Sequence, residues 1–258
     1  MKSVTGPAFI SRVAGAVLSA LKEEAGSILV FLPGSSEIRR VESRLREKSL
    51  PADTDIVALY GELSREAQNA AIRPSSPGRR KVVLATSIAE TSLTIDGVRV
   101  VIDSGLKRVP RFSPSTGMGS LETIRVSKDS AEQRKGRAGR TEPGVCVRLW
   151  TEAENGALRD KATPEIMEAD LASLALDLAV WGAERGGLKW LDAPPEASFD
   201  QATDVLARLG ALDSEGKATN HGRELARLPL HPRLGHMVVK GRELGMGALA
   251  CVIAALLE

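Results

Sequence analysis

The sequence predicts an α/β fold in which helices flank a parallel sheet, with a β-hairpin insertion, followed by a mostly helical domain. Two observations support this class. Short apolar runs alternate with amphipathic helical segments as far as Trp150. Beyond it the alternation ends, and segments with helical periodicity predominate. The apolar runs are continuous, as expected for strands buried on both faces of a parallel sheet. The 258 residues are too many for one small domain.

The elements of the first domain follow in order. A helix is expected over 9–24, where apolar side chains recur at helical spacing until Gly26 ends the pattern. The alternation that follows implies βαβ units with right-handed crossovers. We expect a serine cap on the helix at 36–48. Strands are predicted at 27–32, 55–60, 81–85, 98–103 and 144–150, and further helices at 36–48, 64–72 and 130–138.

Residues 107–126 interrupt the alternation, because two extended runs flank a turn-rich cluster that is typical of a protruding β-hairpin. Helices at 165–181, 199–209 and 220–227, with a tight β-wing at 210–219, suggest a winged helix. The sequence ends inside an apolar run without a helix stop signal, so we expect part of a longer protein. The predicted domains are 1–151, 152–230 and 231–258.

Composition limits the compartment and the partners. The net charge is +2, but residues 105–140 contain nine Lys or Arg against three acidic residues, which could form a polyphosphate-facing strip. Cys146 and Cys251 form neither a disulfide framework nor a metal spacing, and the three histidines form no metal spacing either. Without a signal peptide or a membrane-spanning run, we expect a cytoplasmic protein that does not bind membranes.

The strongest motif is Gln133-Arg-Lys-Gly-Arg-Ala-Gly-Arg140. Arg137 and Arg140 are three residues apart, a spacing that places side chains on one helix face, so both guanidinium groups could point at one polyphosphate. The intervening glycines let another backbone approach closely. Taken alone, the motif fits an RNA-binding basic helix or a solvated surface about as well.

This motif and a second one resemble a known family. QRxGRxGR resembles motif VI of superfamily 2 helicases, and Ala85-Thr-Ser-Ile-Ala-Glu-Thr-Ser-Leu-Thr-Ile-Asp96 resembles motif V of the DEAH/RHA group. Segments such as Leu228-Pro-Leu-His-Pro-Arg233 extend the similarity, which is strongest to bacterial HrpB-type helicases. The resemblance implies a second RecA-like motor lobe, then a winged helix and the start of a ratchet-like helical domain.

The resemblance also implies roles for the residues that face the nucleotide. Gln133 would orient the attacking water or the γ-phosphate, whereas Arg137 and Arg140 would bind phosphate. Arg140 is the best candidate for an arginine finger, a group that can be worth about 10³–10⁵ in rate. Ile72 stands near the place of an adenine-stacking aromatic in many relatives, so apolar contact would replace stacking. The implied nucleotide-binding residues of motif V are Ser92, Thr94 and Asp96.

Other positions would face nucleic acid. Leu29-Val-Phe-Leu-Pro-Gly34 resembles motif IV, although any parallel strand that ends in Pro-Gly would look similar. In the second motif, Ser87 stands where the family usually has Asn. For Glu90 and Thr91, the alternative to a functional role is ordinary turn or helix-capping chemistry. Phe112 could stack at a duplex junction or be a structural aromatic under the hairpin. The implied nucleic-acid-binding residues are Gly34, Ser35, Thr86, Ser87, Arg108 and Arg111.

The sequence contains neither a GxxxxGK[ST] phosphate loop nor a DEAH tetrapeptide. ATP and Mg²⁺ would therefore be bound mainly by a first RecA-like lobe of the same protein, and this chain alone should not hydrolyse ATP. The resemblance implies the C-terminal part of an ATP-dependent helicase that couples ATP hydrolysis to the unwinding of RNA or DNA, and it favours RNA. The alternative is a non-catalytic, nucleic-acid-binding winged-helix module, whereas the missing phosphate loop argues against a P-loop kinase.

Overall fold

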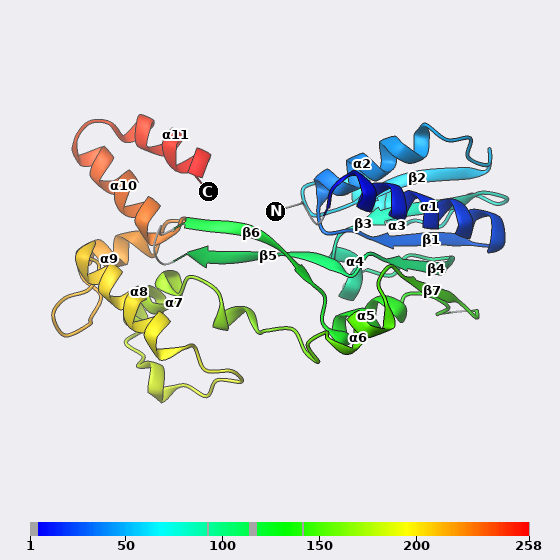
Figure 1. The fold of residues 1–258 in the computed structure, drawn as a ribbon. Helices are drawn as coiled ribbons and strands as arrows, with labels where there is room; N and C mark the ends of the chain where they lie inside the picture. The colour runs from blue at the N-terminus through cyan, green and yellow to red at the C-terminus, as the bar shows by residue number, and fades with distance from the viewer. Residues whose placement is uncertain (1–4, 92, 114–117, 141, 258) are drawn as a thin grey trace. The chain divides into compact units, whose positions relative to one another are not determined.

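The computed structural model describes residues 5–91, 93–113, 118–140 and 142–257. Figure 1 shows its fold. The chain forms two compact units, one made of Met1–Val109 with Leu121–Ala162 and the other of Pro110–Ser120 with Thr163–Glu258. The finer division into domains at 1–151, 152–230 and 231–258 stays a prediction.

A five-stranded parallel sheet in the order β2-β3-β1-β4-β7 forms the centre of the first unit. It confirms the predicted α/β class, and each strand lies within a few residues of its predicted position. The strands are β1 (Ser27–Phe31), β2 (Thr54–Leu59), β3 (Arg80–Ala85), β4 (Val98–Asp103) and β7 (Val145–Arg148).

Strand β1 shows why its sequence is apolar throughout, because all five of its residues are buried. Successive side chains of a strand point to opposite faces. Ile28 and Val30 pack with α1 (Pro7–Glu23) and α2 (Ser35–Arg46). Leu29 and Phe31 pack on the other face with residues of α3 (Arg65–Ile72) and α4 (Ile88–Thr91). The sheet is thus covered by helices on both faces.

Two helices of the first unit differ from expectation. The N-cap of α2 is Gly34, without a side-chain hydrogen bond, so the predicted serine cap is wrong. The helix expected at 130–138 is α5 (Lys128–Lys135), which ends before Gly136. Gly139 then takes the left-handed conformation with a φ of 69°, which a continuing helix could not contain.

The predicted hairpin is present as β5 (Leu106–Ser113) and β6 (Met118–Arg125), which form a two-stranded sheet. Its turn at 114–117 lies outside the described residues. A short helix, α6 (Glu152–Gly156), follows β7, and Thr151 and Glu154 form a capping box at its start.

The second unit is mostly helical, as predicted. The single helix expected at 165–181 is wrong, because Asp170 Oδ1 accepts a hydrogen bond from Ala172 N and starts a new helix there. The expected wing is a single bridge between Leu212 and Ala218. The helical elements are η1 (Glu165–Met167), α7 (Ala172–Trp181), η2 (Arg185–Gly187), α8 (Glu196–Arg208), α9 (Asn220–Leu225), α10 (Pro232–Glu243) and α11 (Gly247–Leu257).

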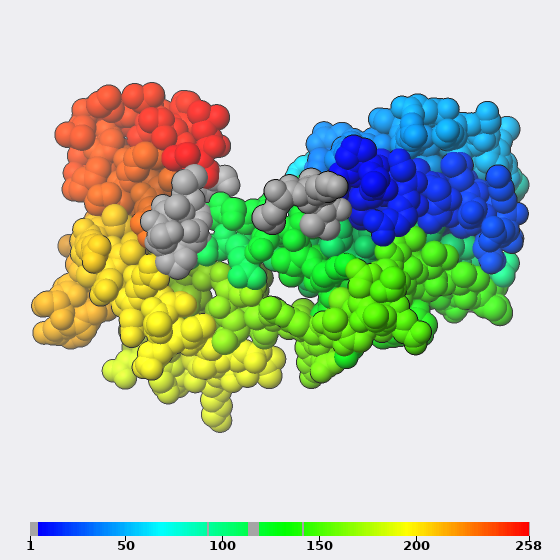
Figure 2. Space-filling view, in the orientation of Figure 1, coloured from blue at the N-terminus to red at the C-terminus, as the bar shows by residue number. Residues whose placement is uncertain are grey.

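Helices α10 and α11 pack against each other and form a continuous part of the surface of the second unit, coloured orange to red in Figure 2. Helix α11 exposes several large apolar side chains: Leu249, Val252, Leu256 and Leu257. No helix in the described part of the chain has the length and apolar character that crossing a membrane requires.

Candidate functional site

The carboxyl ends of three neighbouring strands bring the predicted motifs together. Phe31 pairs with Ala85 on one side and with Asp103 on the other. The backbone continues this alignment, because Leu32 N donates to Ala85 O at 2.8 Å and Ser104 N donates to Phe31 O at 3.3 Å. The loops after β1, β3 and β4 therefore meet at one edge of the sheet, where open α/β sheets bind ligands.

Arg137 follows α5 instead of lying on it, so the expected pair of arginines on one helix face is wrong. Its guanidinium folds back onto the loop after α4. Nη1 donates to Leu93 O at 3.1 Å, and Nη2 donates to the carbonyl oxygens of Glu90 and Thr91. Burial lowers the pKa of Arg137, and the nearby charge of Arg140 lowers it further. Arg137 therefore holds the backbone of the second motif in place.

Arg140 contacts the same loop from an exposed position. Its Nη1 donates to Thr94 Oγ1 at 2.7 Å. Asp96 is exposed at the end of this loop, and Gln133 is exposed on α5. Ser92 lies outside the described residues. The structure thus brings Arg137, Arg140 and Thr94 together from two motifs that are more than forty residues apart in the sequence.

The sequence interpretation missed Arg134, which is fully buried under this loop. Its Nε donates to Glu90 Oε1 at 2.7 Å, and its Nη1 donates to Asp103 Oδ1 at 2.8 Å and to Leu106 O at 3.2 Å. Ser130 Oγ donates to the second Glu90 oxygen at 3.0 Å. One side chain therefore connects α4, the end of β4 and the start of the hairpin. An acidic residue at the end of an apolar strand, Asp103, is the sequence signal that could have indicated a buried partner.

Gly34 and Arg108 form a second cluster, at the start of α2. Arg108 Nη2 donates to Ser36 Oγ at 3.2 Å and lies 3.1 Å from Glu37 Oε2, and Glu37 is only 3% exposed. A Cβ on Gly34 would lie 2.4 Å from Arg108 Nη1, so a side chain at this position would displace the guanidinium. The base of the hairpin is thereby fixed to the N-terminus of α2, next to Ser35.

The remaining predicted contacts lie in two places. Thr86 and Ser87 lie between β3 and α4, and their carbonyl oxygens accept from Ala89 N and Glu90 N. Arg111 belongs to the second unit, where its Nη2 lies 3.4 Å from Glu168 Oε1. The described structure therefore does not place Arg111 in one cluster with Arg108.

In the segment near the expected adenine site, the Gln68 side chain bonds to the backbone of the preceding loop. Gln68 Nε2 donates to Leu63 O at 2.9 Å and to Gly61 O at 3.2 Å. Ile72 is half-buried at the end of α3. Its contact with adenine stays a prediction. Within the described ranges, no group of three or more His, Cys, Asp or Glu side chains is placed to hold a metal ion.

The sequence matches a known protein family and longer relatives. The family model for the helicase conserved C-terminal domain matches residues 12–142. The chain is 43% identical over 251 residues to the ATP-dependent RNA helicase HrpB of Escherichia coli (strain K12). The aligned region covers 97% of this chain and 31% of that protein. It is 40% identical over 246 residues to the pre-mRNA-splicing factor ATP-dependent RNA helicase prp22 of Schizosaccharomyces pombe, covering 92% of this chain and 21% of that protein.

Solved structures show the same relationship. A crystal structure described as the E. coli DExH-box NTPase HrpB matches with a TM-score of 0.84 and 42% identity, covering 96% of this chain and 31% of that chain. A crystal structure described as the E. coli DEAH/RHA helicase HrpB gives a TM-score of 0.88 and 43% identity, with coverages of 95% and 31%. These matches confirm the RecA-like α/β fold and the resemblance to HrpB-type helicases. The chain spans less than a third of the length of each of these relatives.

Proposed function

The chain belongs to the family of the helicase conserved C-terminal domain, and from this we propose that it is the second motor lobe of an ATP-dependent RNA helicase. Its similarity to two proteins named as ATP-dependent RNA helicases supports RNA as the substrate class in preference to DNA. In the whole protein, a first RecA-like lobe would carry the phosphate loop and complete the nucleotide pocket.

One observation carries the proposal. Arg137 and Arg140 both bond to the segment from Glu90 to Thr94, so the two helicase-like motifs form a single surface in the first unit. Both Nη atoms of Arg137 donate to backbone carbonyls and fix the loop. Arg140 is exposed and is therefore the better candidate to reach a partner lobe.

The residues of this surface fit a nucleotide phosphate. A guanidinium has five N–H donors, and the contact with Thr94 uses one nitrogen of Arg140, so donors remain for phosphate oxygens. ATP would supply a phosphoryl group on which negative charge develops, and Arg140 would stabilise that charge. Gln133 would orient the attacking water. Mg²⁺ would accompany the ATP phosphates and be held mainly by the first lobe.

The nucleic-acid backbone would bind where the strand ends meet. Gly34 and Ser35 start a helix of 12 residues, whose N-terminal amides favour a phosphate. Thr86 and Ser87 follow the neighbouring strand end, and the guanidinium of Arg108, which is paired with Glu37, lies beside Gly34. Contacts of this kind position a strand without identifying its sequence, so binding should weaken as salt concentration rises.

The test uses the full-length protein with Arg140→Ala. We expect RNA-stimulated ATP hydrolysis to fall by about 10³-fold or more, whereas the dissociation constant for single-stranded RNA stays within about twofold. Arg46→Ala is the matched control, because Arg46 is exposed on α2 and pairs only with Glu42 among the described residues. Normal ATP hydrolysis by the Arg140 variant would contradict the proposal. RNA binding by a wild-type protein that hydrolyses no ATP would favour the alternative of a non-catalytic binding module.

A further inference from the structure

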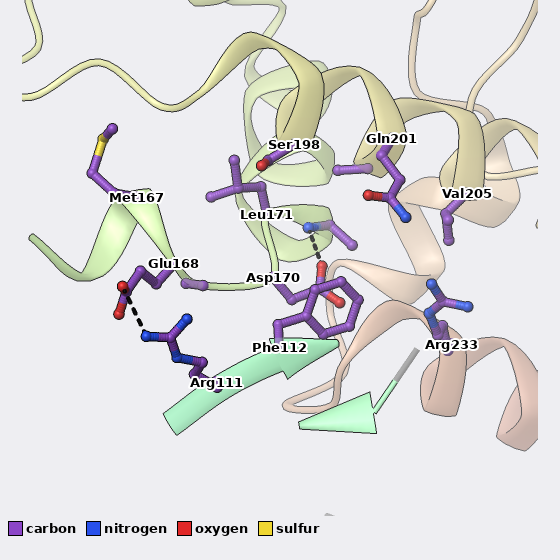
Figure 3. Close-up of a pocket in the computed structure, with 13 residues that line it drawn as sticks. Arg111, Phe112, Met167, Glu168, Asp170, Leu171, Ser198, Gln201, Val205 and Arg233 are labelled. Atoms are coloured by element: carbon purple, nitrogen blue, oxygen red, sulfur yellow. Dashed lines mark hydrogen bonds and ion pairs between the residues drawn. The ribbon is translucent and has the colours of Figure 1, made fainter. Parts of the chain in front are cut away.

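A cavity of ≈ 330 Å³ lies wholly within the second unit, between strand β5, the segment before α7 and helix α8 (Figure 3). Pockets for small ligands measure about 300–1,000 Å³, so this one suits a single small planar group and is too small for a peptide helix. We propose that it binds one nucleobase of the single strand on which the protein acts. The inference rests on the proposed function, because a nucleic-acid strand must be present.

Phe112 provides an aromatic wall. Figure 3 shows its ring projecting from β5 towards Asp170 and Leu171, and the side chain is half-buried. Every nucleobase has a flat π face, so an aromatic ring at the wall of a cavity can stack on a base whatever its identity. The preceding residue, Arg111, also lines the cavity. The hairpin strand therefore contributes both a stacking ring and a cation.

Helix α8 provides polar groups on the opposite wall. Ser198 and Gln201 both line the cavity and are half-buried. Their side chains make no hydrogen bond with any other described residue. The Gln201 amide can donate and accept at once, which matches the mixed donors and acceptors on the edge of a base. An apolar floor of Ala202 and Val205 lies beside them.

The charges of the lining favour a neutral base over a free anion. Two carboxylates and two guanidinium groups line the cavity, so their formal charges cancel. Both carboxylates are engaged, because Glu168 lies 3.4 Å from Arg111 and Asp170 Oδ2 lies 3.0 Å from His231 Nε2. Arg233 differs, since its guanidinium forms no hydrogen bond or ion pair in the described part of the chain, although its charge helps to lower the pKa of Asp170. Its Nη groups, rather than the buried Nε, are therefore available to donate to an acceptor atom of the base.

The experiment uses the full-length protein and oligoribonucleotides in which one 2-aminopurine occupies successive positions. We expect one position to be quenched on binding, since 2-aminopurine fluorescence falls when the base stacks. Phe112→Leu should abolish that quenching and weaken RNA binding by about 5- to 150-fold, the range that corresponds to the loss of one base–aromatic stack. Phe112→Tyr should retain both properties. Gln201→Ala should weaken binding, whereas Asp204→Ala, an exposed change on the same helix, should not.

The outcomes separate this inference from the motor proposal. Equal quenching and equal affinity for the wild type, Phe112→Leu and Phe112→Tyr would overturn the nucleobase pocket. Equal losses in the Leu and Tyr variants would also overturn it, because the aromatic ring would then not be the cause. ATP hydrolysis is measured in the same samples. One quenched position in a wild-type protein that hydrolyses no ATP would support the pocket and overturn the motor proposal instead.

Discussion

Arg134 and Asp103 form an ion pair in which both side chains are 0% exposed, with Arg134 Nη1 at 2.8 Å from Asp103 Oδ1. The same guanidinium also pairs with Glu90 and lies 4.8 Å from the centre of the Phe31 ring. Burial raises the pKa of Asp103, and the positive charge of Arg134 opposes that rise. Two carboxylates thus depend on one buried cation at the point where β4 passes into the hairpin.

Removing this cation should therefore be costly. Arg134→Met keeps much of the side-chain volume but leaves buried carboxylates without their partner, and we expect the free energy of unfolding to fall by about 3–5 kcal/mol. Urea denaturation measures the change. Arg46→Met is the control, because Arg46 forms an exposed pair with Glu42 and such pairs contribute little. Similar losses for the two variants would show that the buried pair does not stabilise the fold.

The fold was predictable because each strand carries its own local signal. All five residues of β1 are apolar or small and all are buried, so a short continuous run was enough to indicate a central parallel strand. The breaks were harder to predict. Asp170 interrupts the helix expected at 165–181 through a bond to Ala172 N and a contact with His231, which lies 61 residues further along the chain. Helical periodicity contains no information about such a distant partner.

The candidate site was predictable only through motifs. Arg137 and Arg140 were identified by their spacing, and the structure places both on the loop of the second motif. Their surroundings were not predictable, because the helix ends at Lys135 and not at 138. Arg134 was missed because its partners Asp103 and Glu90 are 31 and 44 residues away in the sequence. Burial of a charged residue depends on where such partners meet in space.

Gly139 should be intolerant of a side chain, because it shapes the loop that carries Arg140. Its φ is 69°, and a Cβ would lie 2.6 Å from both Glu142 O and Gly144 N. We expect Gly139→Ala to lower the free energy of unfolding by at least about 1–3 kcal/mol, measured by urea denaturation. Gly15→Ala is the control in α1. A Cβ added at Gly15 would meet no atom within 4 Å apart from its own helix backbone, so this change should raise the free energy of unfolding by about 0.5–1 kcal/mol. Equal effects of the two changes would contradict this account of the loop.

Asp170 should make the second unit sensitive to acid. Burial raises its pKa, but the hydrogen bonds from His231 and Ala172 and the nearby positive charges outweigh burial and leave the pKa below its usual value. The carboxylate therefore stabilises the fold above its unfolded pKa of about 3.9, and this contribution is lost as the pH falls through the folded pKa. Near pH 6, we expect Asp170→Asn to reduce the free energy of unfolding by about 1–3 kcal/mol, and the difference from the wild type to shrink towards about pH 3. Urea denaturation across this range measures it, with Asp177→Asn as the exposed control on α7. A difference that stays constant with pH would show that the charge of Asp170 contributes nothing to stability.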